Sequence, residues 1–146
     1  MILEKIRRLR RIVDWLGGLE RHADQLDIPV RSSYKHTKVL VGAMLAQLNN
    51  QKKPGELRDV EFQVFSQFGD DGIIQFLVHS LELTNRTFIE FGVEDYTESN
   101  TRFLLVKDKW TGVVYDGDKN HINYINGQVS ALPEHFFDVD VTKSQR

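Results

Sequence analysis

Two acidic residues in this sequence stand where apolar, strand-like runs give way to glycine. The sequence FIEFGV places Glu90 two residues before Gly92, and the sequence WTGVVYDGD places Asp116 directly before Gly117. Asp116 follows Glu90 by 26 positions. In sheets that bind dinucleotides, an acidic residue about 20 positions after a glycine turn accepts hydrogen bonds from a ribose. A carboxylate suits that task because it offers several acceptor positions to two neighbouring hydroxyl groups.

The residues after Gly92 are a poor match for a cofactor that carries phosphate. A pyrophosphate needs close approach of the backbone, and dinucleotide turns use three glycines for it. Here Gly92 is followed by Glu94, Asp95 and Glu98, whose negative charges would repel a phosphate. S-adenosylmethionine carries a positive sulfonium, an amino group and no phosphate. The pattern therefore favours this cofactor over NAD, FAD or a nucleoside triphosphate.

Helices and strands alternate around these residues. Asp70 and Asp71 are expected to cap a helix over 72–83, and Thr97 or Ser99 to cap a later one. Periodicity and composition predict a strand over 87–93, a helix over 97–109, a strand over 110–118, a short helix over 120–129 and a strand over 135–142. Such alternation predicts βαβ units and a parallel α/β sheet, whose strands end along one edge.

The front of the chain is helical by pattern. Apolar residues at spacings of three and four predict a helix that Gly17-Gly18 ends, followed by a connector over 27–33 that contains Pro29. A second helix is expected over 34–51, and a polar loop then carries Pro54-Gly55. The stripe of the first helix consists of Ile2, Ile6, Leu9, Val13 and Leu16. We therefore divide the chain into a helical segment, 1–53, and a sheet-bearing domain, 54–146.

Charge separates the same two segments. Residues 1–53 hold 11 basic and 5 acidic residues, a balance of +6, whereas residues 54–146 hold 8 and 16, a balance of −8. The negative charge of residues 54–146 argues against nucleic acid as a partner, because a phosphate backbone needs cationic contacts. A basic amphipathic helix can make peripheral contact with an anionic membrane, although docking of its stripe on a core or partner is the interpretation we favour. The chain has no cysteine, which fits a reducing cytoplasmic setting, and no apolar run of about 20 residues that could span a bilayer.

Other candidate chemistry is weaker. Asp138 and Asp140 alternate on the last expected strand, but no third metal ligand accompanies them, so we expect no metal. His121 and the other histidines are scattered without pairing, and we interpret all but His79 as surface residues. Trp110 and Tyr115 are expected in the core. No nucleophile motif is present, so no catalytic residue is assigned.

Three segments in order resemble the opening half of the FkbM-type S-adenosylmethionine-dependent methyltransferases. They are FSQFGDDGII, FIEFGVEDYTESNTRFLL and WTGVVYDGDKNHINYI, within about residues 64–125. The resemblance implies a Rossmann-like sheet and methyl transfer to a hydroxyl of a sugar or another biosynthetic product. Carried over by position, it implies a first cofactor motif at Glu90, Phe91 and Gly92, ribose binding at Asp116 and Gly117, and Asn100 at the start of the helix beside the cofactor.

The resemblance also sets an expectation about completeness. Family members continue through further strands that approach the methyl acceptor, and here the later glycine of the first motif is replaced by Glu94-Asp95-Tyr96. We expect a Rossmann-like sheet truncated after about three strands, which is the N-terminal portion of a methyltransferase and lacks the acceptor half. The alternative is a non-catalytic interaction module that needs a complementing chain or self-association to cover its sheet edge.

Overall fold

The computed structural model describes residues 2–20, 28–130 and 139–143. The chain is mixed α/β and divides into two units, each of which we treat by itself. The first comprises Met1–Val64 and Phe68–Glu82, and the second comprises Phe65–Gln67 and Leu83–Arg146. The first unit thus extends past residue 53. The division into a helical segment and a methyltransferase-like domain at that residue stays a prediction.

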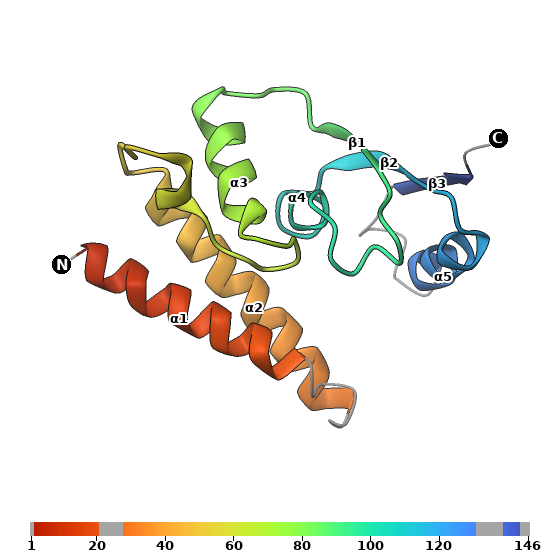
Figure 1. Cartoon of the computed structure of the whole chain (residues 1–146), viewed down its shortest axis with the longest axis horizontal. Helices are drawn as coiled ribbons and strands as arrows, with labels where there is room; N and C mark the ends of the chain where they lie inside the picture. Colours follow the sequence, from red (N-terminus) through yellow and green to blue (C-terminus); the bar gives the residue numbers. More distant parts are fainter. Residues whose placement is uncertain (1, 21–27, 131–138, 144–146) are drawn as a thin grey trace. The chain divides into compact units, whose positions relative to one another are not determined.

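In the first unit, helices α1 (Ile2–Glu20) and α2 (Ile28–Asn49) pack side by side (Figure 1). Ile6, Val13 and Leu16 of α1 are buried, as expected for a stripe that docks on a core. Burying each of these side chains contributes about 2 kcal/mol. The hydroxyl of Tyr34 on α2 also donates a hydrogen bond to the carbonyl oxygen of Leu16.

The ends of these two helices correct two expectations. Gly17-Gly18 does not end the first helix, because α1 continues to Glu20. A glycine inside a helix costs only about 1 kcal/mol, which is less than the neighbouring buried stripe contributes. Pro29 does not lie in a connector but in the first turn of α2. Proline is tolerated there because the first N–H groups of a helix have no partner carbonyl.

The first unit ends with the 3-10 helix η2 (Leu57–Val60) and the helix α3 (Asp70–Ser80). Gly72, in the first turn of α3, lies against the backbone that follows η2. A Cβ atom at Gly72 would lie 2.2 Å from the carbonyl oxygen of Val60 and 2.5 Å from the nitrogen of Phe62. Only glycine fits at this contact.

The expectation that Asp70 and Asp71 cap α3 is wrong. Asp70 and Asp71 do lie in its first turn, but the N-cap residue is Gly69, with φ of 88° and no side-chain hydrogen bond. The Oδ2 atom of Asp71 instead accepts a hydrogen bond from the backbone N–H of Val64 at 2.7 Å. Asp71 is 1% exposed. Its carboxylate therefore holds the preceding loop rather than its own helix.

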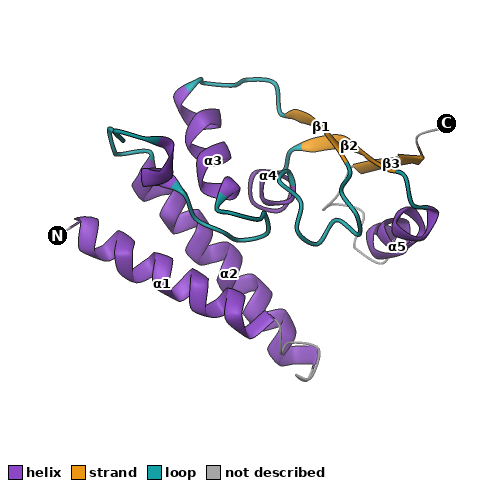
Figure 2. Ribbon diagram, viewed as in Figure 1, coloured by secondary structure: helices purple, strands orange, loops and turns teal. Residues whose placement is uncertain are grey.

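The second unit contains a parallel sheet of β1 (Thr87–Phe91), β2 (Thr111–Asp116) and β3 (Val139–Lys143), in that spatial order (Figure 2). Both neighbouring pairs are parallel. The expected alternation of strands with helices and the parallel sheet are confirmed. The last strand is described over Val139–Lys143, and residues 135–138 of the expected strand lie outside the described part of the chain.

Two helices accompany the sheet. The helix α5 (Lys119–Ser130) contacts β2 and β3, whereas α4 (Arg102–Asp108) is shorter than the helix expected over 97–109. Neither Thr97 nor Ser99 caps α4, because the helix begins only at Arg102. Thr101 occupies the N-cap position.

The side chains on the two faces of β1 differ in their exposure to solvent. Side chains alternate along a strand, so Phe88 and Glu90 share one face and Ile89 and Phe91 the other. Phe88 is 9% exposed, whereas Ile89 is 65% and Phe91 is 73% exposed. The face that carries Phe88 is therefore the packed one.

Candidate functional site

The ends of β1 and β2 bring the two sequence motifs together. Phe91 is the register partner of Tyr115, and the N–H of Gly92 donates to the carbonyl oxygen of Tyr115 at 2.8 Å. The loops that follow β1 and β2 therefore begin side by side, at the carboxyl ends of the two strands. In open parallel sheets, ligands bind beyond the carboxyl ends of the strands.

Gly92 makes the turn that ends β1. Its φ is 70°, in the region that glycine tolerates best. A Cβ atom at this position would meet nothing within 4 Å. Glycine thus adopts this backbone conformation with the least strain, and the space beside it is open.

Asp116 joins three parts of the site. Its Oδ2 atom accepts from the N–H of Glu94 at 2.8 Å, and its Oδ1 atom accepts from the N–H of Asp118 at 2.8 Å and faces Nδ1 of His121 at 3.1 Å. Burial opposes the charged form of Asp116, which is 8% exposed. The hydrogen bonds from Asp118, His121 and Glu94 outweigh burial and lower the pKa of this carboxyl.

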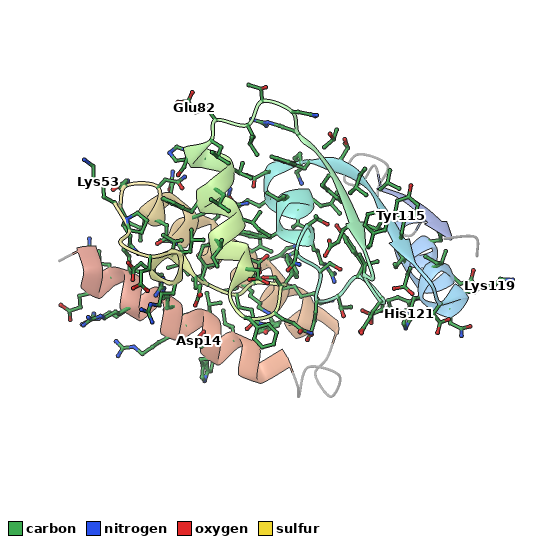
Figure 3. The ribbon with its side chains drawn as sticks, turned by 45° about the horizontal axis from the view of Figure 1, so that its top comes forward. Asp14, Lys53, Glu82, Tyr115, Lys119 and His121 are labelled. Carbon is green, nitrogen blue, oxygen red and sulfur yellow. The ribbon has the colours of Figure 1, made fainter. Side chains whose placement is uncertain are left out.

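His121 is the partner that the sequence interpretation missed. It lies in the first turn of α5 (Figure 3), and its side chain is 37% exposed. The hydrogen bond to Asp116 raises the pKa of the imidazole, against a smaller opposing effect of burial. Its position offered a signal, since the first turn after a parallel strand returns close to the strand end. His121 is thus part of the site rather than a plain surface histidine.

Glu90 has protein partners for both of its oxygens. Oε1 accepts from the N–H of Asn100 at 2.9 Å, and Oε2 accepts from the N–H of Thr101 at 3.0 Å and from its hydroxyl at 2.5 Å. A carboxylate in an apolar strand is expected to have a function or a partner. The partner of Glu90 is the backbone just before α4. Asn100 was expected at the start of the helix and lies two residues before α4, where it is exposed.

The loop between β1 and α4 is held by Tyr96. Its hydroxyl lies 2.9 Å from Oγ1 of Thr101, and its carbonyl oxygen accepts from Nη1 of Arg102 at 2.7 Å. The Arg102 guanidinium lies 4.8 Å from the centre of the Phe65 ring. Burial, with a smaller effect of the Glu90 charge, raises the pKa of Tyr96 against the hydrogen bond to Thr101. Tyr96 and Thr101 were not singled out from the sequence.

Phe91 differs from the other predicted site residues. Its ring stacks on that of Tyr115, with centroids 5.0 Å apart and planes 14° apart. Tyr115 is half-buried and so is not the fully buried core residue that was expected, whereas Trp110 is buried at 6% exposure as expected. By strand alternation, Phe91 and Glu90 belong to opposite faces. Gly117 is exposed directly after Asp116.

The edge carries a surplus of negative charge. Several of its carboxylates accept local hydrogen bonds: Asp95 from Thr97, Glu98 from Gln67 and Asp118 from Asn120. Such bonds satisfy oxygens without removing charge. The carboxylates of the second unit near this edge are Glu94, Asp95, Glu98, Asp116 and Asp118. The edge suits a cationic ligand better than an anionic one.

Comparisons with protein-family models, curated proteins and solved structures return no match. Within the described residues, no three His, Cys, Asp or Glu side chains gather closely enough to hold a metal ion. Asp138 lies outside the described residues. None of the described helices has the length and apolar character needed to cross a membrane.

Proposed function

We propose that the second unit is the cofactor-binding part of an S-adenosylmethionine-dependent methyltransferase with a Rossmann-like sheet, similar to the FkbM type. One observation carries the proposal: the turn at Gly92 after β1 is joined to Asp116 at the end of β2 through the N–H of Glu94 at 2.8 Å. A glycine turn and an acidic residue on adjacent parallel strands are the two parts that an adenosine-bearing cofactor requires.

Asp116 would bind the ribose. Its Oδ1 atom now faces His121, whose side chain is 37% exposed. A ribose hydroxyl can take the place of the imidazole because the partly exposed ring can turn away. The acidic edge would then attract the sulfonium and the amino group, and Gly92 would leave room for the cofactor. Phe91 lies on the other sheet face, so we propose a supporting role for it and no direct contact.

The proposed reaction moves one methyl group. The bond from the methyl carbon to the sulfonium sulfur breaks, its electron pair stays on sulfur, and a hydroxyl oxygen of the acceptor forms the new bond. The products are S-adenosylhomocysteine and a methyl ether, and a base takes the hydroxyl proton. Positioning supplies most of the rate in such a displacement. We propose a saccharide or another small biosynthetic molecule as the acceptor, and a cytoplasmic setting.

Isothermal titration calorimetry with S-adenosylmethionine and S-adenosylhomocysteine tests the proposal. Asp116→Ala should weaken binding about 10- to 150-fold, as expected for lost hydrogen bonds to a charged group. His121→Ala should instead tighten binding, because it removes one of the two partners of Oδ1 of Asp116 and leaves only the N–H of Asp118. Asp14→Ala, which removes an exposed carboxylate of α1, is the matched control and should change nothing. A folded wild-type chain that binds neither compound at millimolar concentration would overturn the proposal.

A second candidate is a non-catalytic interaction module. The observation that favours it is the exposure of Ile89 and Phe91, at 65% and 73%, on one face of β1. Exposed apolar residues on a strand invite a partner or self-association. If the chain is such a module, neither S-adenosylmethionine nor S-adenosylhomocysteine binds. Ile89→Lys then lowers the mass measured by light scattering, because it disrupts self-association. Cofactor binding by the wild-type chain decides for the first candidate.

A further inference from the structure

Helix α1 has a second face that the packing of the first unit does not use. Trp15, opposite the buried stripe of Ile6 and Val13, is 65% exposed, and Ile12, beside that stripe, is 42% exposed. A shallow surface hollow is lined by these two residues together with Arg8 and Arg11. The spacing of the four residues, at three or four positions, places them on one flank of the helix.

The exposed surface of α1 carries a surplus of positive charge. Arg8 and Arg11 line the hollow, and Lys5 and Arg7 are exposed elsewhere on the helix. The acidic residues nearby are Asp14 and Glu4, and Glu4 lies 3.6 Å from Arg8 in an ion pair whose two side chains are 71–72% exposed. These four basic and two acidic side chains leave a surplus of two positive charges. The ion pair of Glu4 and Arg8 is so exposed that it contributes little stability. The apolar side chains of Trp15 and Ile12 therefore lie next to the basic side chains of Arg8 and Arg11.

The charge and shape of this flank favour one kind of binding partner over the others. A second copy docked face to face would set the arginines of both chains against each other, which is repulsive. The residues that line the hollow all belong to α1, so the surface is the side of one helix, which suits a flat partner better than an inserted peptide. Tryptophan favours the headgroup level of a bilayer, and arginine reaches lipid phosphates while its stem stays in apolar surroundings.

We propose that α1 binds the surface of a bilayer that contains anionic lipids, with Trp15 and Ile12 entering the headgroup region and Arg8 and Arg11 contacting phosphate groups. The helix lies in the plane of the surface and does not cross it. This proposal is independent of the function proposed for the second unit, because it concerns side chains of the first unit alone.

Tryptophan fluorescence of the full chain provides the test. The chain has two tryptophans, and Trp110 is 6% exposed, so a shift of emission on binding reports Trp15. We expect a blue shift with vesicles of equal parts phosphatidylcholine and phosphatidylserine, little shift with phosphatidylcholine alone, and reversal by salt. Trp110→Phe should keep the shift. No shift with either vesicle would overturn the proposal and leave an acidic protein surface as the occupant.

Vesicle flotation measures the variants without relying on fluorescence. Arg8→Gln and Arg11→Gln should each weaken partitioning about fivefold, and Trp15→Ala at least about tenfold. Leu40→Ala and Met44→Ala on α2 are the matched controls, because these apolar residues are 66% and 52% exposed but lie outside the basic flank. Equal flotation of all five variants would contradict the assignment of the surface.

Discussion

The carboxylate of Glu90 and residue Thr101 are joined by two hydrogen bonds, 3.0 Å from the backbone N–H and 2.5 Å from the hydroxyl. Together with the bond from the N–H of Asn100, they give the start of α4 a cap that comes from a strand rather than from a neighbouring residue. The first N–H groups of a helix need such acceptors. Glu90 thus fixes the loop that runs from β1 to α4.

Removal of this cap should destabilise the protein. Glu90→Ala loses three hydrogen bonds to a charged acceptor, and we expect a loss of about 2–4 kcal/mol in the free energy of unfolding. Glu90→Gln keeps an acceptor oxygen and should lose less. Urea denaturation followed by circular dichroism measures both changes.

Glu98→Ala is the control for Glu90, since its carboxylate belongs to the same loop. Glu98 makes an exposed hydrogen bond to Gln67 at 2.8 Å, so its loss should cost no more than about 0.5 kcal/mol. If the two alanine variants are equally stable, Glu90 does not act as a cap, and a direct role at the ligand becomes the better explanation.

Gly72→Ala tests the close packing at the start of α3. The new Cβ atom would lie 2.2 Å from the carbonyl oxygen of Val60, which is backbone and cannot move aside cheaply. We expect a loss of about 3 kcal/mol or more. Gly127→Ala on α5 is the matched control, because a Cβ there meets nothing within 4 Å and alanine is the better helix former by about 1 kcal/mol. Thermal unfolding should move in opposite directions for the two variants.

The sequence predicted the order of strands and helices well because that order follows from local periodicity. It predicted the edge at which Gly92 and Asp116 meet because parallel strands must end together. It did not predict the end of α1, since the packing of the stripe overrides the two glycines, nor the position of Pro29, which is compatible with a loop and with a first helical turn.

The partners of the acidic residues were not predictable from their spacing. Asp71 was assigned to its own helix but bonds to Val64, and Glu90 bonds to residues ten and eleven positions later. Such contacts depend on how a loop folds back, which has no periodic signal. The pairing of His121 with Asp116 was predictable in principle, because His121 follows the end of the strand by five residues, although it is not paired with another histidine.

Tyr96 should ionise only at unusually high pH. Burial raises its pKa above the ordinary 10.0, so the folded state keeps a proton that the unfolded state releases. The stability that this group contributes is therefore present below pH 10.0 and is lost as the pH rises through the higher value of the folded state. Ultraviolet titration of tyrosinate should show a late step that Tyr96→Phe removes and that the exposed-residue control Tyr124→Phe leaves in place. A titration that Tyr96→Phe leaves unchanged would contradict this environment.

The pair of Asp116 and His121 predicts a window of pH in which it stabilises the fold. The pKa of Asp116 is lowered from 3.8, so its contribution is present above pH 3.8 and is lost as the pH falls through the lower value of the folded state. The pKa of His121 is raised from 6.5, so its contribution is complete below pH 6.5 and is lost as the pH rises through the higher value of the folded state. The pair is therefore strongest between these two pH values.

His121→Ala should accordingly lower the free energy of unfolding most at pH 4–6, within that window, and progressively less as the pH rises above 6.5. Urea denaturation at a series of pH values measures the difference from the wild-type chain. His36→Ala, which removes an exposed histidine of α2, should show no such dependence. A difference for His121→Ala that stays constant from acid to alkaline pH would mean that the imidazole acts by packing alone, and that its charge does not stabilise Asp116.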